Sequence, residues 1–472
     1  MSQPTGIKFG TDGWRGIIAK DFTFKNVEII SQAIGDWVNK DLKGNQQTKT
    51  VCVGFDTRFL SGGFAETVAC VLAANGIKVI LSDRAVPTPA VSFTVKNRGL
   101  DAGVMITASH NPPQFNGVKI KTGDGGAAPQ SVTEKVEGYL NETPVKRIDF
   151  NQAKQEKLIA VDDLTEDYVK FIRRYLDLAR IKKARFKILV DAMHGSGDGF
   201  TAQILKGTNI KVTLMRDKIN PSFDGKRPEP VVENLEDILR RMKTENFDLG
   251  LVLDGDADRI AAVASGGEFI HPQKILALLA MHLNQDRKMD GGVVKTIAGT
   301  VLMDKVCQGL DLKLYETPVG FKYISELMTT KDILVGGEEA GGMGLKNYIP
   351  ERDGTLAGLL LLEMMVYRKK HIGKIVKEME DKYGRFYYLR ADLKTSRLNI
   401  NLDKLKEIKT LAGKKVTEVK DYDGIKLICE DLSWLMFRAS GTEPLMRVYS
   451  EASSLARSKQ LLKLGEKIVK EL

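Results

Sequence analysis

Short apolar runs alternate with amphipathic stretches along most of the 472 residues, and this alternation limits the fold more than any other feature of the sequence. Apolar runs bounded by turn residues are typical of buried strands, and they lie at 50–54, 78–81, 103–106, 186–190, 211–215, 249–253, 292–296 and 333–335. The stretches between them have helical periodicity, with examples at 26–39, 63–74, 235–243, 273–282 and 354–368. Strands that alternate with helices build α/β domains, so the sequence predicts the α/β fold class.

The length and the breaks in this pattern predict four domains. At roughly 100–200 residues per domain, a chain of 472 residues holds two to four of them. Charged helical segments at 166–179 and 373–382 lead into new strands, and a third break at His271–Pro272 follows a Gly-Gly turn. The last stretch has more β-like alternation and then a Lys-rich amphipathic helix at 452–472. We predict three α/β domains and a smaller α+β domain, at 1–182, 183–272, 273–383 and 384–472.

Composition narrows the classes of function. The formal net charge is +10, but the lysines and arginines are spread along the chain rather than concentrated in one tract. A basic surface suits any anionic partner, and no zinc-finger spacing, RNP-like aromatic motif or basic-plus-heptad region favours nucleic acid. The four cysteines lack CxxC spacing, no apolar run reaches the ~18 residues of a membrane-spanning helix, and the N-terminus lacks a signal-peptide layout. We expect a cytoplasmic protein with no nucleic-acid partner and no membrane association.

The segment LVLDGDADRI at 251–260 places Asp254, Asp256 and Asp258 at alternate positions directly after an apolar strand. Carboxylates this close repel one another, and a hard divalent cation with oxygen ligands, Mg²⁺ or Ca²⁺, relieves that repulsion. An EF-hand loop also begins D-x-D-x-D, but its sixth and twelfth positions require Gly and Glu, where this chain has Arg259 and Ser265. An acidic surface turn is the simpler alternative. We predict metal binding, because a strand that runs directly into such a cluster is unusual for a turn.

The segment MITASHNPP at 105–113 raises the question of a nucleophile. A strand ends at Ile106, and we expect Ser109 to lie exposed in the turn that follows. A nucleophile elbow reads G-x-S-x-G, which T-A-S-H-N does not match, so an α/β-hydrolase is disfavoured. From these residues alone, an ordinary Ser/Asn turn and a nucleophile fit equally well. His110 is a candidate base, although a structural hydrogen-bonding role suits a side chain that is adjacent only in sequence.

Two Gly-rich loops carry groups that suit a sugar phosphate. VGGEEAGGMG at 335–344 holds Glu338 and Glu339, whose carboxylates accept hydrogen bonds from sugar hydroxyls; a mobile acidic turn is the alternative. FRASGTEPLMRVYSE at 437–451 combines hydroxyls, backbone N–H groups and arginines into a phosphate cradle; a turn with one surface salt bridge is the alternative. The candidate residues of this cradle are Arg438, Ser440, Gly441, Thr442 and Arg447.

Three further stretches are less specific. FGTDGWRGII at 9–18 offers Arg15 in a Gly-flanked loop, and FDTR at 55–58 offers Arg58 after a strand. Spacing alone does not separate a binding role from a surface arginine at either position. DAMHGSGDGF at 191–200 reads G-x-G-x-G rather than G-x-G-x-x-G, so we interpret it as a structural turn and not as a dinucleotide site.

Taken together, these segments resemble the α-D-phosphohexomutase superfamily of phosphoglucomutases and phosphomannomutases. TASHNP resembles its phosphoserine loop, DGDADR its metal loop, GEEAGG its sugar-specificity loop and RASGTEP its phosphate-binding loop, in the family's order along the chain. FGTDGWRG extends the resemblance toward the N-terminus. The resemblance implies three similar α/β domains with mixed sheets plus a smaller C-terminal α+β domain, arranged around a central cleft to which each domain contributes one loop.

The resemblance also implies roles for single residues. Ser109 would carry the transferable phosphoryl group, and the three aspartates of the metal loop would hold Mg²⁺ together with an oxygen of that phosphoserine. Arg259 would reach toward the phosphoryl group, and His110 stays among the catalytic candidates. The predicted substrate-binding residues are Arg15, Glu338, Glu339, Arg438, Ser440, Gly441, Thr442 and Arg447.

Two lysines are candidates for proton transfer. Lys119, in NGVKI, matches a motif lysine proposed for this role in the family, and Lys322, in GFK, resembles the lysine of the GWK motif in glucose-type enzymes. Many bacterial phosphomannomutase-type members end the sugar loop with a histidine, as GEMSGH, where this chain has Gly342. Either lysine needs a lowered pKa to act as a base near pH 7.

The GEEAGG loop is more similar to the GEES loop of glucose-type mutases than to GEMSGH. We therefore predict interconversion of glucose 1-phosphate and glucose 6-phosphate through a phosphoserine enzyme and a hexose 1,6-bisphosphate, with Mg²⁺ as cofactor and glucose 1,6-bisphosphate as activator. Phosphomannomutase, phosphoglucosamine mutase and hexose bisphosphate synthase are the alternatives within the family, and a Mg-dependent phosphatase is the alternative of a different class. The expected partners are small hexose phosphates, and we expect a monomer or a homodimer.

Overall fold

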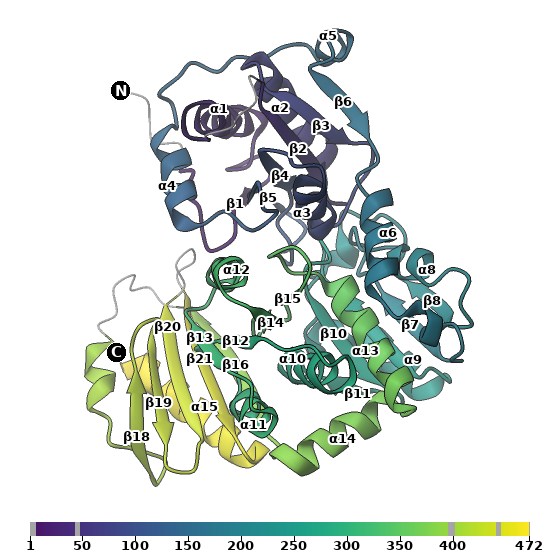
Figure 1. Cartoon of the computed structure of the whole chain (residues 1–472). Coiled ribbons are helices and arrows are strands. Elements are labelled where there is room, and N and C mark those ends of the chain that lie inside the picture. The colour runs from purple at the N-terminus through teal and green to yellow at the C-terminus, as the bar shows by residue number, and fades with distance from the viewer. Residues whose placement is uncertain (1–5, 43–47, 395–401, 440–444, 472) are drawn as a thin grey trace.

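The computed structural model describes residues 6–42, 48–394, 402–439 and 445–471. Three units with mixed sheets and a C-terminal unit with an antiparallel sheet follow one another along the chain, which confirms the predicted fold class (Figure 1). We call these units domains I to IV. In Figure 1 domain I lies at the top and domain IV at the lower left.

Domain I contains a six-stranded sheet in the order β1-β5-β4-β2-β3-β6. The strands β2, β3, β4 and β6 run parallel, and β5 and β1 add an antiparallel edge. The strands are β1 (Trp14–Ile17), β2 (Thr50–Phe55), β3 (Lys78–Ser82), β4 (Ala102–Ile106), β5 (Phe115–Thr122) and β6 (Ile159–Asp162). The helices that precede the first strand of domain II are α1 (Phe24–Asp41), α2 (Ser61–Ala74), α3 (Thr88–Asn97), α4 (Gln130–Gly138), α5 (Phe150–Gln155), α6 (Glu166–Tyr175) and α7 (Leu178–Ile181).

Domains II and III repeat the same plan with fewer strands. Their sheets have the orders β11-β10-β9-β7-β8 and β13-β12-β14-β15. The strands are β7 (Lys187–Asp191), β8 (Lys211–Met215), β9 (Leu249–Leu253), β10 (Ile260–Ala264), β11 (Glu268–Ile270), β12 (Gly292–Thr296), β13 (Leu314–Thr317), β14 (Ile333–Gly337) and β15 (Met343–Leu345). The helices are α8 (Phe200–Ile204), η1 (Phe223–Gly225), η2 (Val232–Asn234), α9 (Glu236–Thr244), α10 (Pro272–Met281), η3 (His282–Asp286), α11 (Val301–Leu310), α12 (Phe321–Thr330), α13 (Gly354–Arg368) and α14 (Ile372–Tyr383).

The three mixed sheets share one feature that positions the site. In each, a buried parallel strand turns back into an antiparallel neighbour: β4 into β5, β9 into β10 and β14 into β15. The connecting loops are 107–114, 254–259 and 338–342, and they begin at the carboxyl ends of parallel strands, where α/β folds place ligands. Three of the four predicted loops therefore occupy equivalent places in three similar domains.

Domain IV is an antiparallel sheet covered by one long helix. Its strands follow the order β16-β21-β20-β19-β18-β17, and α15 packs on β21, β16 and β20. The elements are β16 (Tyr387–Lys394), η4 (Asp403–Glu407), β17 (Thr410–Leu411), β18 (Lys414–Lys420), β19 (Ile425–Cys429), β20 (Trp434–Ala439), β21 (Leu445–Ala452) and α15 (Leu455–Glu471).

One hydrophobic core runs through domains I, II and III. It contains Phe93 of α3, Leu251 of β9 and Leu360 of α13, among others. The helix α13 is buried from Gly354 to Met365 and packs on β9, β10 and α10, as its apolar character on all sides predicts (Figure 1). A shared core holds the three loop-bearing sheets in fixed relative positions.

Two sequence expectations about helices need correction. The helical segment expected at 166–179 is two helices, because Leu176 leaves helical geometry and Asp177 begins α7 by accepting a hydrogen bond from Arg180 N. The helix expected at 452–472 begins at Leu455, because Ala452 is the last residue of β21.

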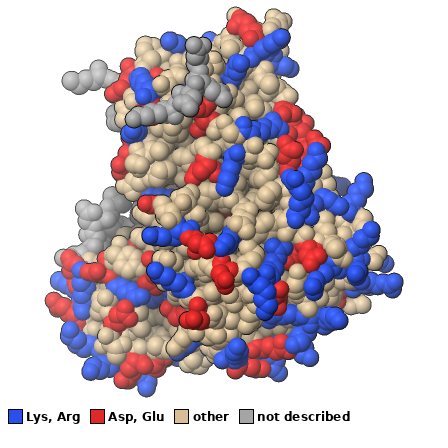
Figure 2. All heavy atoms as spheres, viewed as in Figure 1, with Lys and Arg blue, Asp and Glu red and all other residues tan. Residues whose placement is uncertain are grey.

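Surface charge and helix composition bear on the expected partners. Figure 2 shows lysines and arginines interspersed with acidic residues over the visible face, in line with the even spread of charge along the sequence. Within the described ranges, no helix has both the length and the apolar character needed to cross a bilayer.

Candidate active site

The loop between β4 and β5 places Ser109 against the metal-loop turn of domain II. The serine hydroxyl donates a hydrogen bond to Asp254 Oδ2 at 2.8 Å, and its backbone N–H donates to Thr107 Oγ1 at 2.8 Å. The side chain is only 1% exposed, so the expectation of an exposed serine is wrong, because domain II covers the loop. A Cβ on Gly255 would lie 2.5 Å from the Ser109 carbonyl oxygen, so this close approach requires glycine.

Arg58 holds the backbone of this loop. Its guanidinium donates hydrogen bonds to the carbonyl oxygens of Ser109 at 2.5 Å, Asn111 at 2.7 Å and Pro112 at 2.9 Å, and it lies 3.3 Å from Asp56 Oδ2. Ser109 has a φ of 52°, a left-handed conformation that persists only where the surroundings enforce it. The rigid fork of Arg58 provides that enforcement, which identifies a positioning role that spacing alone did not reveal.

The three aspartates of the metal loop lie in the hairpin turn between β9 and β10. Asp254, Asp256 and Asp258 are all buried, and one oxygen of each lies within 4.8 Å of the others. Two of their buried oxygens, Asp256 Oδ1 and Asp258 Oδ1, accept no hydrogen bond from the described residues. Burial and the charges of Asp258 and Asp256 raise the pKa of Asp254 well above its usual value. A hard divalent cation would neutralise the buried negative charge and bind the unpartnered oxygens, so this donor set fits Mg²⁺.

Lys119, on β5, lies among these carboxylates. Its Nζ atom lies 2.8 Å from Asp12 Oδ2, 2.8 Å from Asp256 Oδ2 and 2.9 Å from Asp258 Oδ2. Burial lowers the pKa of the lysine, but attraction to the three carboxylates outweighs burial and raises the pKa above its usual value. In this arrangement Lys119 is a charged hydrogen-bond donor and not a neutral base.

The metal loop and the sugar loop are joined through their backbones. Ile260 N donates to Gly341 O at 3.1 Å, and Arg259 and Gly342 form an isolated β-bridge. Arg259 N also donates to Asp254 Oδ1 at 3.0 Å, while its Nε lies 3.9 Å from Asp258 Oδ1. Nη1 lies 3.9 Å from Glu229 Oε1, and because both side-chain contacts are long, the Arg259 guanidinium is able to bind an anion beside the cluster.

The sugar loop presents two buried carboxylates. Thr296 Oγ1 donates a hydrogen bond to Glu339 Oε2 at 2.9 Å. The Glu338 carboxylate lies 3.4 Å from Arg352 Nη1, yet burial outweighs this attraction and raises the pKa of Glu338 to about 7. Backbone bonds close the loop, from Glu338 N to Gly342 O at 3.0 Å and from Gly341 N to Glu338 O at 3.1 Å. The two carboxylates predicted to bind sugar hydroxyls are thus held at a fixed place beside the metal loop.

Arg15 and His110 flank the serine. Arg15 Nη1 donates to Asn111 Oδ1 at 2.5 Å, and His110 Nδ1 lies 3.4 Å from Ser109 Oγ. Burial, with the positive charges of Arg259 and Arg15, lowers the pKa of His110 well below its usual value. His110 is therefore neutral near pH 7, and its long contact with the serine oxygen keeps it a candidate without assigning it a role.

Two of the predicted arginines lie on adjacent strands of domain IV. Arg438 Nε donates to Asp423 Oδ1 at 2.8 Å, and Arg438 pairs with Arg447 across β20 and β21. Arg447 Nε is buried without a hydrogen-bond partner among the described residues, as expected of a group that binds an anion. The predicted residues Ser440, Gly441 and Thr442 lie outside the described residues.

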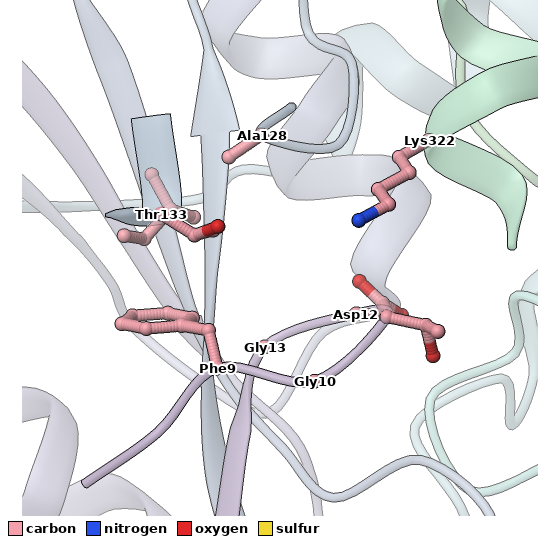
Figure 3. Close-up of a pocket in the computed structure, with 9 residues that line it drawn as sticks. Phe9, Gly10, Asp12, Gly13, Ala128, Thr133 and Lys322 are labelled. Atoms are coloured by element: carbon pink, nitrogen blue, oxygen red, sulfur yellow. The ribbon is translucent and has the colours of Figure 1, made fainter. Parts of the chain in front are cut away.

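Lys322 stands at the start of α12 and faces a pocket between domains III and I. Figure 3 shows its ammonium directed toward the loop that carries Gly10, Asp12 and Gly13. Lys322 Nζ donates to Gln130 Oε1 at 3.2 Å, and burial lowers the pKa of this half-buried lysine. Of the two candidate lysines, Lys322 is the one whose surroundings favour loss of a proton.

Sequence reasoning missed two charged residues at the centre of the site. Asp12, within the FGTDGWRG segment, contacts Lys119 and Arg352, and Arg352, after β15, contacts Asp12 and Asp258. Asp12 lay inside a segment already noted, but only its arginine was singled out. Arg352 carries no local signal, since its partner Asp12 is 340 positions away along the chain.

Known proteins of one family match the chain over nearly its whole length. The phosphoglucomutase/phosphomannomutase models match alpha/beta/alpha domain I at 6–146, domain II at 166–267, domain III at 271–383 and the C-terminal domain at 391–463. A phosphoglucomutase/phosphomannomutase of Thermococcus kodakarensis is 30% identical over 99% of both chains. A phosphoglucosamine/phosphogalactosamine mutase of Sulfurisphaera tokodaii is 29% identical over 98% of this chain and 99% of the relative. A Thermus thermophilus structure that carries the name phosphomannomutase is 36% identical, with a TM-score of 0.87 and 100% coverage of both chains.

The fold and the loops define a sugar-phosphate mutase, and the chain belongs to the phosphoglucomutase/phosphomannomutase family of the α-D-phosphohexomutase superfamily, which confirms the resemblance. Members of this family are mutases, which are intramolecular phosphotransferases, so the chain is a phosphohexomutase. The relatives carry the names of different sugars, so family membership leaves the sugar open.

Proposed function

We propose that this phosphohexomutase interconverts glucose 1-phosphate and glucose 6-phosphate through a phosphoserine at Ser109 and a hexose 1,6-bisphosphate, with Mg²⁺ held by Asp254, Asp256 and Asp258. The contact between Ser109 Oγ and Asp254 Oδ2, at 2.8 Å, carries the proposal. It puts the serine hydroxyl of the TASHNP loop against the acidic cluster, where a phosphoryl group on that oxygen would meet a cation on the carboxylates.

The phosphoryl transfer takes place in two steps, first from Ser109 to the sugar and then from the sugar to Ser109. In the first, the bond between phosphorus and Ser109 Oγ breaks, a new bond forms to the free hydroxyl of the hexose monophosphate, and the hydroxyl proton passes to a base. In the second, the other phosphoryl group of the bisphosphate returns to Ser109 Oγ, and the released sugar oxygen takes up a proton. When bound, Mg²⁺ supplies positive charge for the oxygens of the phosphoryl group in transfer.

The chain's own residues then take the following roles. Arg58 fixes the serine backbone. Arg259, at the end of the metal loop, would approach the phosphoryl oxygens. Lys119 supplies a fixed positive charge and hydrogen bonds, whereas Lys322, whose pKa burial lowers, is the candidate for proton transfer. The arginines of domain IV, with Ser440, Gly441 and Thr442, would hold the phosphate that is not reacting, and Arg15 would assist from domain I.

The choice of glucose rests on the sugar loop. Glu338 and Glu339 offer two carboxylates to the hydroxyls, as in the GEES loop of glucose-type mutases, and position 342 carries no histidine. A Cβ at Gly342 would lie 2.2 Å from Arg352 Cδ, so the arginine takes the space that a side chain at this position needs. Mannose and glucosamine phosphates stay alternative substrates. The cytoplasmic location, the activator role of glucose 1,6-bisphosphate and the monomeric or homodimeric state stay predictions.

A coupled assay tests this proposal. The protein is given glucose 1-phosphate and Mg²⁺, with and without catalytic glucose 1,6-bisphosphate, beside mannose and glucosamine phosphates. We expect glucose 6-phosphate to form fastest and to depend on the bisphosphate. Release of inorganic phosphate instead would identify a phosphatase, net accumulation of bisphosphate would identify a synthase, and no turnover by protein that bears phosphoserine would refute the choice of hexose.

A further inference from the structure

Arg352 lies at the point where three domains meet. It is 2% exposed and follows β15 in the loop that ends at α13. The next residue, Asp353, fixes this loop, because it caps α13 by accepting a hydrogen bond from Leu356 N at 2.8 Å. The backbone that carries Arg352 is thus anchored to the shared core, and its side chain extends from a rigid support.

The guanidinium of Arg352 contacts carboxylates from all three domains that supply a described site loop. Nη2 lies 2.7 Å from Asp258 Oδ2 in the metal loop and also contacts Asp12 of domain I. Nη1 lies 3.4 Å from Glu338 Oε2 in the sugar loop, and Nε lies 3.3 Å from Glu351 Oε1. The Arg352 guanidinium therefore bridges Asp258, a predicted metal ligand, and Glu338, a predicted acceptor of hydroxyl hydrogen bonds.

Packing restricts the movement of the Arg352 side chain, so its guanidinium can change only how closely it contacts each neighbouring carboxylate. Its stem fills the space beside Gly342, and its guanidinium lies 5.3 Å from the centre of the Phe321 ring. The contacts themselves are unequal, since the one to Asp258 is short and the one to Glu338 is long. Because one planar guanidinium contacts both carboxylates, a change of charge at Asp258 alters the contact between Arg352 and Glu338.

We propose that Arg352 is a positioning residue that couples cation binding at Asp258 to hexose binding at Glu338. The inference rests on the proposed metal site and goes beyond it, because it names the residue that makes the two binding events depend on each other. Arg352 and Lys119 now share the neutralisation of the Asp258 carboxylate, and a cation bound there would take over part of it. The guanidinium would then be free to strengthen its contact with Glu338 and to hold that carboxylate in place for the sugar hydroxyls.

Coupling of this kind is reciprocal, so it is measurable from the cation side. A phosphate group near the cation raises cation affinity by simple attraction, and that general effect must be separated from the part that passes through Glu338. Inorganic phosphate reports the general effect alone. The equilibrium mixture of glucose 1-phosphate and glucose 6-phosphate reports the general effect and the part that passes through Glu338. The increase in Mg²⁺ affinity caused by this mixture, divided by the increase caused by inorganic phosphate, therefore measures the coupling through the sugar loop.

The experiment is isothermal titration calorimetry of Mg²⁺ into the full chain, alone, with saturating inorganic phosphate and with the saturating hexose phosphate mixture. For the natural protein we expect the hexose phosphates to raise Mg²⁺ affinity by roughly five-fold or more beyond phosphate. Arg352→Met should reduce this excess nearly to one. Arg352→Lys should keep part of it, because an ammonium lacks the fork that reaches both carboxylates. Arg241→Met, which removes a surface arginine paired with Glu245, should keep the excess unchanged.

The outcomes separate the two proposals. If Mg²⁺ and the hexose phosphates both bind but the natural protein shows no excess over phosphate, the coupling is refuted while the proposed function stands. The coupling is also refuted if Arg352→Lys keeps the full excess, and this variant decides the question should Arg352→Met fail to fold by its thermal melt. If Mg²⁺ does not bind the natural protein at all, the metal site of the proposed function falls, and this inference falls with it.

Discussion

Arg58 Nη2 lies 2.5 Å from the carbonyl oxygen of Ser109, so the residue that carries the proposed chemistry is held by a side chain 51 positions earlier in the chain. The same guanidinium is buried against Asp56. A lysine in its place keeps the charge but cannot reach several carbonyl oxygens at once. The site thus depends on the planar shape of this group as well as on its charge.

Replacement of Arg58 should therefore lower both stability and turnover. Arg58→Met removes the cation that faces the buried Asp56 carboxylate and the donors to the carbonyl oxygens of Ser109 and Asn111, which costs about 3–5 kcal/mol of unfolding free energy. Arg58→Lys should cost less and still reduce kcat, because the loop loses its fixed geometry. Urea unfolding and the coupled mutase assay check both points. Natural kcat in Arg58→Lys would show that the fork does not position the serine.

Removal of the Ser109 hydroxyl should abolish mutase turnover and leave the fold intact. Ser109→Ala deletes one hydrogen bond to Asp254, a loss of about 1 kcal/mol, and adds no bulk. The coupled assay should fall to its background, while the thermal melt stays close to that of the natural protein. Full activity in this variant would remove Ser109 as the phosphoryl carrier.

The metal loop should lose its cation when one carboxylate is neutralised. Asp256→Asn retains the size of the side chain but removes the negative charge and replaces one carboxylate oxygen with an NH2 group, so Mg²⁺ affinity should fall at least roughly ten-fold. Calorimetric titration with Mg²⁺ measures this directly. Asp237→Asn, a surface change on α9, is the matched control and should bind Mg²⁺ normally. Equal affinity in the two variants would contradict the metal assignment.

The pH dependence of catalysis should report on Glu338. Burial raises the pKa of this carboxyl to about 7, so it is ionised and able to accept hydroxyl hydrogen bonds above that pH and protonated below it. We therefore expect kcat/KM to fall as the pH decreases through about 7. Glu338→Gln should lower kcat/KM about ten- to a hundred-fold and should lose this particular pH step. A step that persists unchanged in Glu338→Gln belongs to another group.

The sequence predicted the parts of the site that are local. The metal loop and the serine loop each lie within ten residues of a strand end. The sequence alone therefore predicted that Asp254 and Ser109 follow strands. The buried hairpin partner β10 was not predicted, because its run IAAVA has no alternation that marks a face. The burial of Ser109 was also missed, since a different domain covers it.

What stayed hidden depends on contacts between distant segments. Asp12, Lys119, Asp258 and Arg352 come from three domains and form one network of charges in the interior. No spacing rule joins residues that are hundreds of positions apart. Their buried charges become understandable only once each is seen beside its partners, because an unpaired charge is not tolerated in a core.

A single-turnover experiment on phosphorylated protein tests the central claim most directly. Protein bearing phosphate at Ser109, confirmed by peptide mass spectrometry, is mixed with equimolar glucose 1-phosphate and Mg²⁺ and quenched over time. The account predicts that phosphate leaves Ser109 as glucose 1,6-bisphosphate appears, and that it returns to Ser109 as glucose 6-phosphate forms. Loss of the Ser109 phosphate as inorganic phosphate, or turnover while Ser109 stays unphosphorylated throughout, would contradict it.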